Sequence, residues 1–185
     1  MSNKMLLVVD YQNDFVDGAL GFPGAEKLDA PISEKVKEYA KNGDIIVMTQ
    51  DAHSADYLNT REGKALPVPH CICGSDGYNP YGETGKALFA MATDEKLADN
   101  LVVLPKATFG VAPRDMVEKL SCFDVKEIEV VGLVTNMCVL ANVCCFQAMW
   151  PDAQITVDSA LVSSFDHKLH QKTLDVLRGM QVKVV

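Results

Sequence analysis

The sequence has no run of basic residues and no long hydrophobic segment. Its 185 residues carry a formal net charge of −8, which argues against a nucleic-acid partner, because such partners are usually bound by clustered Lys and Arg. The apolar start at residues 5–9 is broken by Asp10, so it is too short for a signal-peptide core or a membrane span. We therefore expect a cytoplasmic protein with neither nucleic acid nor membrane as a partner.

Low-complexity stretches are also few, and 48% of the residues are hydrophobic. A chain of this length and composition can bury a substantial core, which predicts a single domain over residues 1–185. Six cysteines would indicate disulfides in a short secreted chain, whereas in a cytosolic enzyme they are more often buried, metal-bound or catalytic. The adjacent Cys144 and Cys145 are predicted to fill the core as small hydrophobic residues.

The sequence does contain a regular alternation of two kinds of segment. Apolar runs of strand length, which predict strands buried on both faces, lie at residues 5–9, 45–48, 101–104, 128–131, 155–157 and 182–185. Helical patterns lie between them at residues 25–42, 114–120, 137–149 and 166–179, the first stopped by Gly43. This alternation predicts an α/β fold in which helices cover both faces of a parallel sheet.

Four chemically capable residues fall at the carboxyl ends of predicted strands, where such sheets bind their ligands. They are Asp10, Asp51, Lys106 and Cys138. Cys138 opens the helix after the fourth strand, where unpaired amides and the helix dipole lower a thiol pKa, so it is the candidate nucleophile. Asp10 is the candidate general base, and Lys106 is the cation that pairs with both. The alternatives are a capping carboxylate, a solvated lysine and an inert buried cysteine.

These residues and their surroundings resemble the isochorismatase-like cysteine hydrolases, and among them the nicotinamidases, over nearly the whole chain. The family's Asp, Lys and Cys triad matches Asp10 in VVDYQNDF, Lys106 in LPKATF and Cys138 in GLVTNMCV. The resemblance implies a three-layer sandwich around a mostly parallel, six-stranded, Rossmann-like sheet. It also implies a cis peptide bond between Leu133 and Val134, with the amides of Val134 and Cys138 forming an oxyanion hole.

The long segment after the second predicted strand holds a candidate metal site. Asp51 and His53 stand two residues apart and His70 follows later, a mixed oxygen and nitrogen set that suits zinc, iron or manganese. Taken alone this spacing is a weak signal, and ordinary loop polarity is the alternative. Nicotinamidases carry their ligands in the same pattern, so the resemblance implies a divalent metal, with zinc preferred and Glu62 as a further ligand, either direct or through a bridging water.

The resemblance also implies a substrate. Nicotinamide would be hydrolysed to nicotinic acid and ammonia through a cysteine thioester, in NAD salvage. A metal can bind the ring nitrogen and so orient the carboxamide toward Cys138. Phe15 matches a position that stacks on the ring in the family, with plain core packing as the alternative, and Phe109 is predicted to form another wall of the pocket.

Two features depart from the family pattern. The segment KATFGVAPRD lacks the usual tyrosine after Lys106, and the tryptophan that often flanks the metal ligands is missing, since the only one is Trp150. An amidase for another small amide or carbamoyl compound therefore stays open, as does a non-catalytic metal or thiol protein. Family members are often homo-oligomers, which the resemblance implies for this chain as well.

Overall fold

The computed structural model describes residues 3–185 and is built around one six-stranded sheet. The strands are β1 (Lys4–Val9), β2 (Ile45–Asp51), β3 (Leu101–Lys106), β4 (Glu127–Leu133), β5 (Gln154–Ser163) and β6 (Lys183–Val184). They lie in the order β3-β2-β1-β4-β5-β6, and every neighbouring pair is parallel. The predicted α/β fold is confirmed, with a sheet that is wholly rather than mostly parallel.

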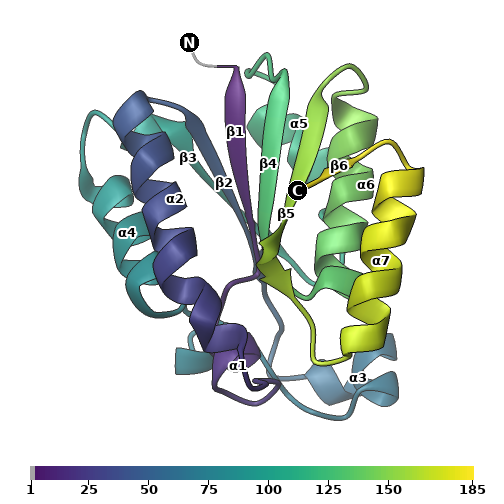
Figure 1. Ribbon diagram of the computed structural model, residues 1–185. Helices are drawn as coiled ribbons and strands as arrows, with labels where there is room; N and C mark the ends of the chain where they lie inside the picture. Colours follow the sequence, from purple (N-terminus) through teal and green to yellow (C-terminus); the bar gives the residue numbers. More distant parts are fainter. Residues whose placement is uncertain (1–2) are drawn as a thin grey trace.

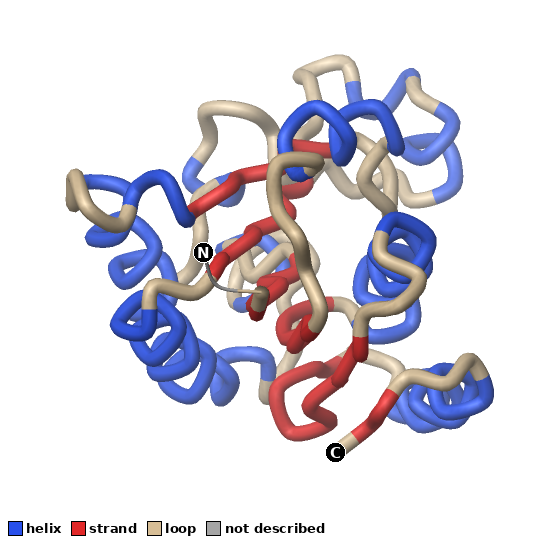
Figure 2. Tube along the Cα trace, turned by 90° about the horizontal axis from the view of Figure 1, so that it is seen from above, coloured by secondary structure: helices blue, strands red, loops and turns tan. Residues whose placement is uncertain are grey.

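Helices cover both faces of this sheet (Figure 1). The α-helices of the described residues are α1 (Asn13–Val16), α2 (Asp29–Asn42), α3 (Arg61–Ala65), α4 (Gly82–Thr93), α5 (Pro113–Leu120), α6 (Leu140–Met149) and α7 (His167–Gly179). Helices α2 and α4 pack on one face, whereas α5, α6 and α7 pack on the other. Figure 2 shows the sheet between these two groups of helices. The three-layer sandwich implied by the resemblance is therefore confirmed.

Two hydrophobic clusters, one on each face of the sheet, hold the layers together. In β1, Leu7 and Val9 belong to the cluster with α5, α6 and α7, whereas Leu6 and Val8 belong to the cluster with α2 and α4. All four side chains are fully buried. Successive side chains of a strand point to opposite faces, so the unbroken apolar run of β1 fits a strand that is covered on both sides.

Strand β3 departs from this pattern because it is an edge of the sheet. Only Leu104 and Lys106 are buried in it, and Val103 is 41% exposed. The prediction that residues 101–104 are buried on both faces is therefore wrong. Pro105 agrees with the edge position, since a proline has no amide hydrogen to donate to a neighbouring strand.

Other local predictions differ from the structure at particular places. Helix α4 was not expected, because glycines interrupt its sequence and Tyr81 at its start has no capping side chain. The cap comes from α2 instead, where the Asp29 carboxylate accepts hydrogen bonds from the Glu83 and Thr84 amides at 2.8 Å. Cys144 is exposed and Cys145 is only partly buried, so the prediction that both fill the core is wrong. Helix α6 instead turns Val143 and Phe146 inward.

The ends of the helices follow local signals more closely. Gly43 closes α2 in a left-handed conformation with φ 72°, as predicted, and a residue without a side chain adopts this at little cost. The Asp166 carboxylate accepts a hydrogen bond from the Leu169 amide at 2.9 Å and so caps α7.

Within residues 3–185, no helix combines the length and the apolar character needed to cross a membrane.

The strand order reverses at β1, and this places the site. The chain runs outward from β1 to β2 and β3, then returns to β4 on the other side of β1. Loops leaving β1 and β4 therefore part at the carboxyl ends of the strands and open a crevice between them. This is the lower end of the sheet in Figure 1, where α1 and α3 also lie.

Candidate active site

A carboxylate, an ammonium and a thiol meet in this crevice. Lys106 Nζ lies 2.7 Å from Asp10 Oδ2 and 3.6 Å from Cys138 Sγ. Asp10 follows β1, Lys106 is the last residue of β3, and Cys138 comes shortly after β4. All three are buried. The parallel sheet thus brings together the three residues that were predicted to be catalytic.

The Asp10 carboxylate is fixed by the neighbouring strand. Asp10 has a φ of 44°, a left-handed conformation that is uncommon outside glycine and that turns the chain at the end of β1. Thr49 Oγ1 donates a hydrogen bond to Asp10 Oδ1 at 2.6 Å, and the Asp10 amide donates to Thr49 O at 3.1 Å. The second carboxylate oxygen, Oδ2, is the one that faces Lys106.

Burial shapes the protonation of these groups. It raises the pKa of Asp10, against the opposing charge of Lys106. It also raises the pKa of the Cys138 thiol, and the charge and hydrogen bond of Asp10 add to this. Burial alone would lower the pKa of Lys106, but the charges of Asp10 and Cys138 outweigh it and the pKa is raised. The expected lowering of the Cys138 pKa is wrong, because desolvation and a nearby carboxylate outweigh the helix amides.

Cys138 lies on a single π-helical turn, Thr135–Val139, that leads from β4 into α6. Asn142 Nδ2 donates a hydrogen bond to Cys138 O at 2.8 Å. Thr135 Oγ1 lies 2.9 Å from Nδ1 of the buried His170, which α7 carries. Two helices on the same face of the sheet therefore hold the turn that presents the thiol.

The peptide bond between Leu133 and Val134 is cis, as the resemblance implies. Val134 and Cys138 both line the cavity described below. Their role as oxyanion donors stays a prediction.

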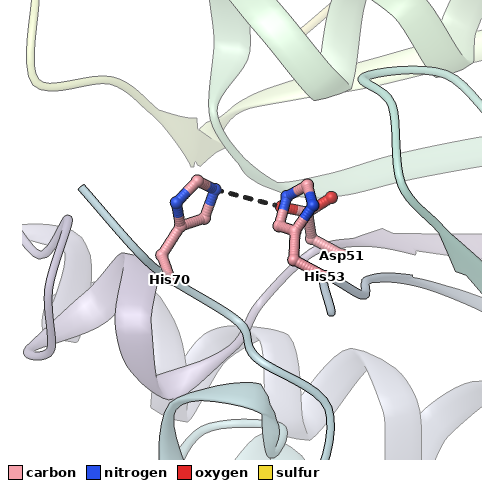
Figure 3. A group of neighbouring side chains, drawn as sticks. All are labelled: Asp51, His53 and His70. Carbon is pink, nitrogen blue, oxygen red and sulfur yellow. Dashed lines mark hydrogen bonds and ion pairs between the residues drawn. The ribbon is translucent and has the colours of Figure 1, made fainter. Parts of the chain in front are cut away.

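The second part of the site is a buried group formed by Asp51, His53 and His70 (Figure 3). One ligand atom from each lies within 4.8 Å of the others. His53 Nε2 is 3.0 Å and His70 Nε2 is 3.3 Å from the same oxygen, Asp51 Oδ2. Asp51 ends β2, and the loop that carries His70 returns beside it, with the His53 amide donating to Cys71 O at 3.0 Å. The three predicted metal ligands are thus brought together.

The bonding of His70 favours a cation at this group. His70 Nδ1 lies 2.8 Å from Val68 O, and a carbonyl oxygen only accepts, so Nδ1 carries a proton and a neutral ring has its lone pair on Nε2. That lone pair faces Asp51 Oδ2 at 3.3 Å, and two acceptors this close need a shared proton or metal ion. Burial alone would lower the pKa of His70, but its hydrogen bonds to Asp51 and Val68 raise it. One carboxylate and two imidazoles are a donor set that zinc accepts.

Glu62 and Tyr57 lie at the edge of this group. Glu62 Oε1, on α3, is 3.8 Å from His53 Nε2 and 4.0 Å from His70 Nε2. Glu62 is therefore placed beside the group, and its role as a ligand stays a prediction. The Tyr57 ring packs at an angle against both imidazoles, with centroid distances of 4.6 Å and 5.0 Å. Tyr57 was not among the predicted site residues.

One ammonium joins the two parts of the site. Lys106 Nζ lies 3.2 Å from Asp51 Oδ1 as well as 2.7 Å from Asp10 Oδ2. Burial would raise the pKa of Asp51, but its bonds to His53 and His70 and the charge of Lys106 hold that pKa well below its usual range. Asp51 therefore stays ionised and faces Lys106 with one oxygen and the imidazoles with the other.

A cavity of about 380 Å³ opens beside both parts. Polar residues of both groups, namely Asp51, Glu62, His70 and Cys138, reach its wall. The rest of its lining is largely apolar and consists of Phe15, Ala19, Leu20, Gly21, Leu66, Phe109, Val134, Met137 and Phe165. The cavity thus offers a ligand mostly apolar contact and a few polar contacts.

Both predicted aromatic walls line this cavity, and several further residues do so unpredicted, among them Phe165 and Leu66. Phe15 is buried with its ring centroid 5.5 Å from that of His70, whereas Phe109 is 41% exposed. Phe165 and Leu66 were not expected. Phe165 follows the carboxyl end of β5, so the strand-end rule would have found it had the strand been predicted beyond residue 157. Leu66 had no such signal, since it lies just after the short helix α3.

A buried thiol that lies beside an ammonium and a carboxylate and opens on a largely apolar cavity has the surroundings that a covalent nucleophile needs. The comparison with known proteins identifies the family of the chain. The family model described as the isochorismatase domain matches residues 4–185, and the chain belongs to this family.

Relatives within the family include nicotinamidases. An isochorismatase family protein of Bacillus subtilis (strain 168), PncA, described as uncharacterized, is 30% identical over 172 residues, 90% of either chain. The crystal structure of nicotinamidase/pyrazinamidase PncA from Bacillus subtilis matches with a TM-score of 0.87 at 26% identity, covering 100% of both chains. The pyrazinamidase of Pyrococcus horikoshii, solved in complex with zinc, shares the fold with a TM-score of 0.78 at 23% identity, covering 100% of this chain and 99% of that one.

Proposed function

We propose that the protein is a metal-containing nicotinamidase that hydrolyses nicotinamide to nicotinic acid and ammonia through a thioester on Cys138. The observation that carries this proposal is that Cys138, Asp51 and His70 all reach the wall of one apolar cavity. Such a cavity suits a flat aromatic amide, because apolar walls take the ring while a few polar groups fix its orientation. The likeness to the Bacillus subtilis nicotinamidase/pyrazinamidase supports the same substrate class.

In the first half of the reaction, Asp10 takes the thiol proton as Cys138 Sγ attacks the amide carbon. Asp10 Oδ2 and Cys138 Sγ lie 2.7 Å and 3.6 Å from the same Lys106 ammonium, which supports a short path for this proton. The amides of Val134 and Cys138 are the donors proposed for the developing oxyanion. When the C–N bond breaks, Asp10 gives its proton to the leaving nitrogen, so ammonia departs and a thioester remains.

In the second half, Asp10 takes a proton from a water molecule whose oxygen attacks the thioester carbon. The C–S bond breaks, the proton passes from Asp10 to the departing sulfur, and nicotinic acid is released. Lys106 stays charged throughout, because its contacts with Asp10 and Asp51 raise its pKa. Its ammonium therefore stabilises whichever of Asp10 and Cys138 carries the negative charge.

The group of Asp51, His53 and His70, with Glu62 beside it, fits a divalent metal, because His70 Nε2 and Asp51 Oδ2 face each other as two acceptors at 3.3 Å. Zinc at this group would supply a Lewis-acid contact for the ring nitrogen of a pyridine. The zinc complex of the Pyrococcus horikoshii pyrazinamidase supports this choice of metal. The chain itself would orient the substrate ring, because Phe15 lines the cavity next to His70. The apolar lining would also limit the access of water to the thioester.

The test is the release of ammonia from a panel of small amides led by nicotinamide, with bound metal quantified in the same sample. We expect ammonia and nicotinic acid in equal amounts from nicotinamide, and no product above background from Cys138→Ala. Cys122→Ala is the matched thiol control, because Cys122 is exposed and does not line the cavity. Unchanged turnover in Cys138→Ala would refute the thioester mechanism.

A second candidate is the hydrolysis of another small amide or carbamoyl compound. It is favoured by Phe109 and Phe165, which are 41% and 60% exposed and form an open side of the cavity. A substrate longer than a single ring could extend between them. Turnover of another member of the amide panel, without turnover of nicotinamide, would select this candidate.

We also assign the reaction to NAD salvage in the cytoplasm. The six cysteines are all free, which supports a reducing location. A homo-oligomeric state stays a prediction.

A further inference from the structure

The side chain of Gln12 forms hydrogen bonds to Asp51, one of the three proposed metal ligands, but does not line the cavity. Gln12 is fully buried, and its side chain takes part in three hydrogen bonds. Its Oε1 accepts from the Asp51 amide at 2.8 Å, and its Nε2 donates to Asp51 O at 2.9 Å. Nε2 also donates to Tyr78 O at 2.8 Å. Two of the three bonds therefore hold the backbone of Asp51.

These two bonds replace a missing strand. Strands β1 and β2 pair in parallel up to Val9 and Thr49, after which β1 turns away at Asp10 while β2 continues to Asp51. In a parallel sheet the amide and the carbonyl of one residue point to the same neighbour, so those of Asp51 face the place that β1 has left. The Gln12 amide fills this place, with its oxygen and nitrogen paired as a peptide group would be.

The backbone of Gln12 is itself held firmly. The Tyr81 amide donates to Tyr11 O at 3.0 Å, and the Asn13 amide donates to Asn79 O at 3.0 Å. These bonds flank Gln12 on either side and pair it with Pro80 in an isolated antiparallel bridge. The side chain is therefore aimed at Asp51 from a fixed base.

We infer that Gln12 is a positioning residue that sets the metal affinity of the site by holding the main chain of Asp51 in register. This inference rests on the proposed function, because it concerns the metal proposed there. Asp51 Oδ2 must lie between two imidazoles while Oδ1 faces Lys106, so a small shift of its backbone disturbs both sets of contacts. Groups that orient a metal ligand typically change metal affinity by about 10- to 100-fold when they are removed.

A substitution of the nearby Gln50 distinguishes support of Asp51 by Gln12 from a purely structural role of Gln12. Gln50 Nε2 donates to the same carbonyl, Tyr78 O, at 2.9 Å and is also buried. No side-chain bond from Gln50 to Asp51 is found in the part of the chain that the structure describes. Gln50→Met therefore removes an anchor of the loop, whereas Gln12→Met removes an anchor of the loop and the support of Asp51.

The experiment measures the affinity of the full-length apoprotein for Co²⁺ alone, from its visible absorption, and for Zn²⁺ by competition with a chelating dye. We expect Gln12→Met to bind both ions about 10- to 100-fold more weakly than wild type and to show altered Co²⁺ bands. Gln50→Met should bind them as wild type does. Saturating metal should restore most of the amidase activity of Gln12→Met and none of that of Cys138→Ala.

Equal affinity of Gln12→Met and wild type would overturn the inference, as would equal weakening by both glutamine variants, which would point to loop anchoring. If Gln12→Met does not fold by circular dichroism, Gln12→Ser replaces it, since the smaller residue leaves space for water and carries the same expectation. A wild-type protein that binds neither ion would remove the metal from the proposed function and this inference with it. A wild type that binds metal but cleaves no amide would leave the inference standing and refute the proposed function.

Discussion

The two parts of the site are built in different ways. Asp10, Lys106 and Cys138 stand at the ends of three strands, so their relative positions follow from the register of the sheet. In the group of Asp51, His53 and His70 only Asp51 belongs to a strand, while the two histidines lie on the segment of residues 52–81. That segment is held by isolated bridges, such as the one between His53 and Ile72, and by separate side-chain bonds, such as the bond from the Cys71 amide to Asp14 Oδ2 at 2.7 Å. Substitutions in the first part should therefore abolish activity, whereas those in the second should tune it.

The largest effect is expected where the two parts meet, at Lys106. Lys106→Met removes the ammonium that lies between Asp10, Asp51 and Cys138. We expect a loss of kcat of about 10³-fold or more. Breaking a buried ion pair leaves an uncompensated charge, so the free energy of unfolding should fall by about 3–5 kcal/mol. Steady-state kinetics and urea unfolding measure the two effects.

The matched control is Lys86→Met, because Lys86 pairs with Glu83 at 2.7 Å on the exposed surface of α4. Exposed pairs contribute little to stability, so this variant should behave as wild type. Equal stability of the two lysine variants would show that the ammonium does not hold the two parts together.

Removal of the metal should lower activity without changing the fold that holds Asp10, Lys106 and Cys138. A chelator is expected to lower kcat/KM for nicotinamide by at least about 10-fold, the effect typical of a disturbed metal site, because the ring loses its orientation. The far-UV circular dichroism should not change, since the triad rests on the sheet. Added Zn²⁺ should restore activity to the chelated wild type. Full activity in metal-free protein would contradict the proposed role of Asp51, His53 and His70.

Phe15 and Phe109, the two predicted aromatic walls of the cavity, should differ in their effect on stability, because one is buried and the other is exposed. Phe15→Ala should destabilise the fold by about 3–5 kcal/mol, because its ring is buried in the core. Phe109→Ala should change stability by no more than about 0.5 kcal/mol, since Phe109 is 41% exposed. Each should raise KM for nicotinamide by about 2- to 10-fold if the ring packs between them. Thermal unfolding and initial rates over a range of substrate concentrations test both statements.

This contrast also explains what the sequence could predict. The strand-end rule found Asp10, Asp51, Lys106 and Cys138 because position in a parallel sheet depends on short apolar runs that are visible in the sequence. His53 and His70 were found by their residue types and by resemblance to the family. The contacts between these groups were not predictable in the same way. That Lys106 reaches Asp51 depends on the register of β2 and β3, which pairs the two residues directly.

Residues that act through a neighbour had no signal in the sequence. Gln12 and Asn142 are ordinary polar residues in the sequence, and their importance comes from the backbone groups that they meet. The raised pKa of Cys138 was missed for a related reason, since it depends on burial and on the nearby Asp10. Such effects require distances between segments that lie far apart in the chain.

The smallest effect is expected at His170 of α7, whose ring contacts Thr135 on the turn that carries Cys138. Burial lowers the pKa of His170, and His167, whose ring stacks on it at a centroid distance of 6.0 Å, adds to this. Below the ordinary value of 6.5, the unfolded chain therefore binds a proton that the folded chain does not. Stability from this group is complete above that pH and is lost as pH falls through the lower folded pKa.

The measurement is urea unfolding of wild type and His170→Gln between pH 5 and pH 8. The two free energies of unfolding should differ by a constant amount at the alkaline end, and the difference should shift against wild type as the pH falls below about 6.5. His167→Gln is the control, because it removes the neighbouring charge but keeps the bond between Thr135 and His170, so its acid loss should be weaker than that of wild type. A difference that stays constant across the whole range would show that His170 does not couple the stability of the turn to pH.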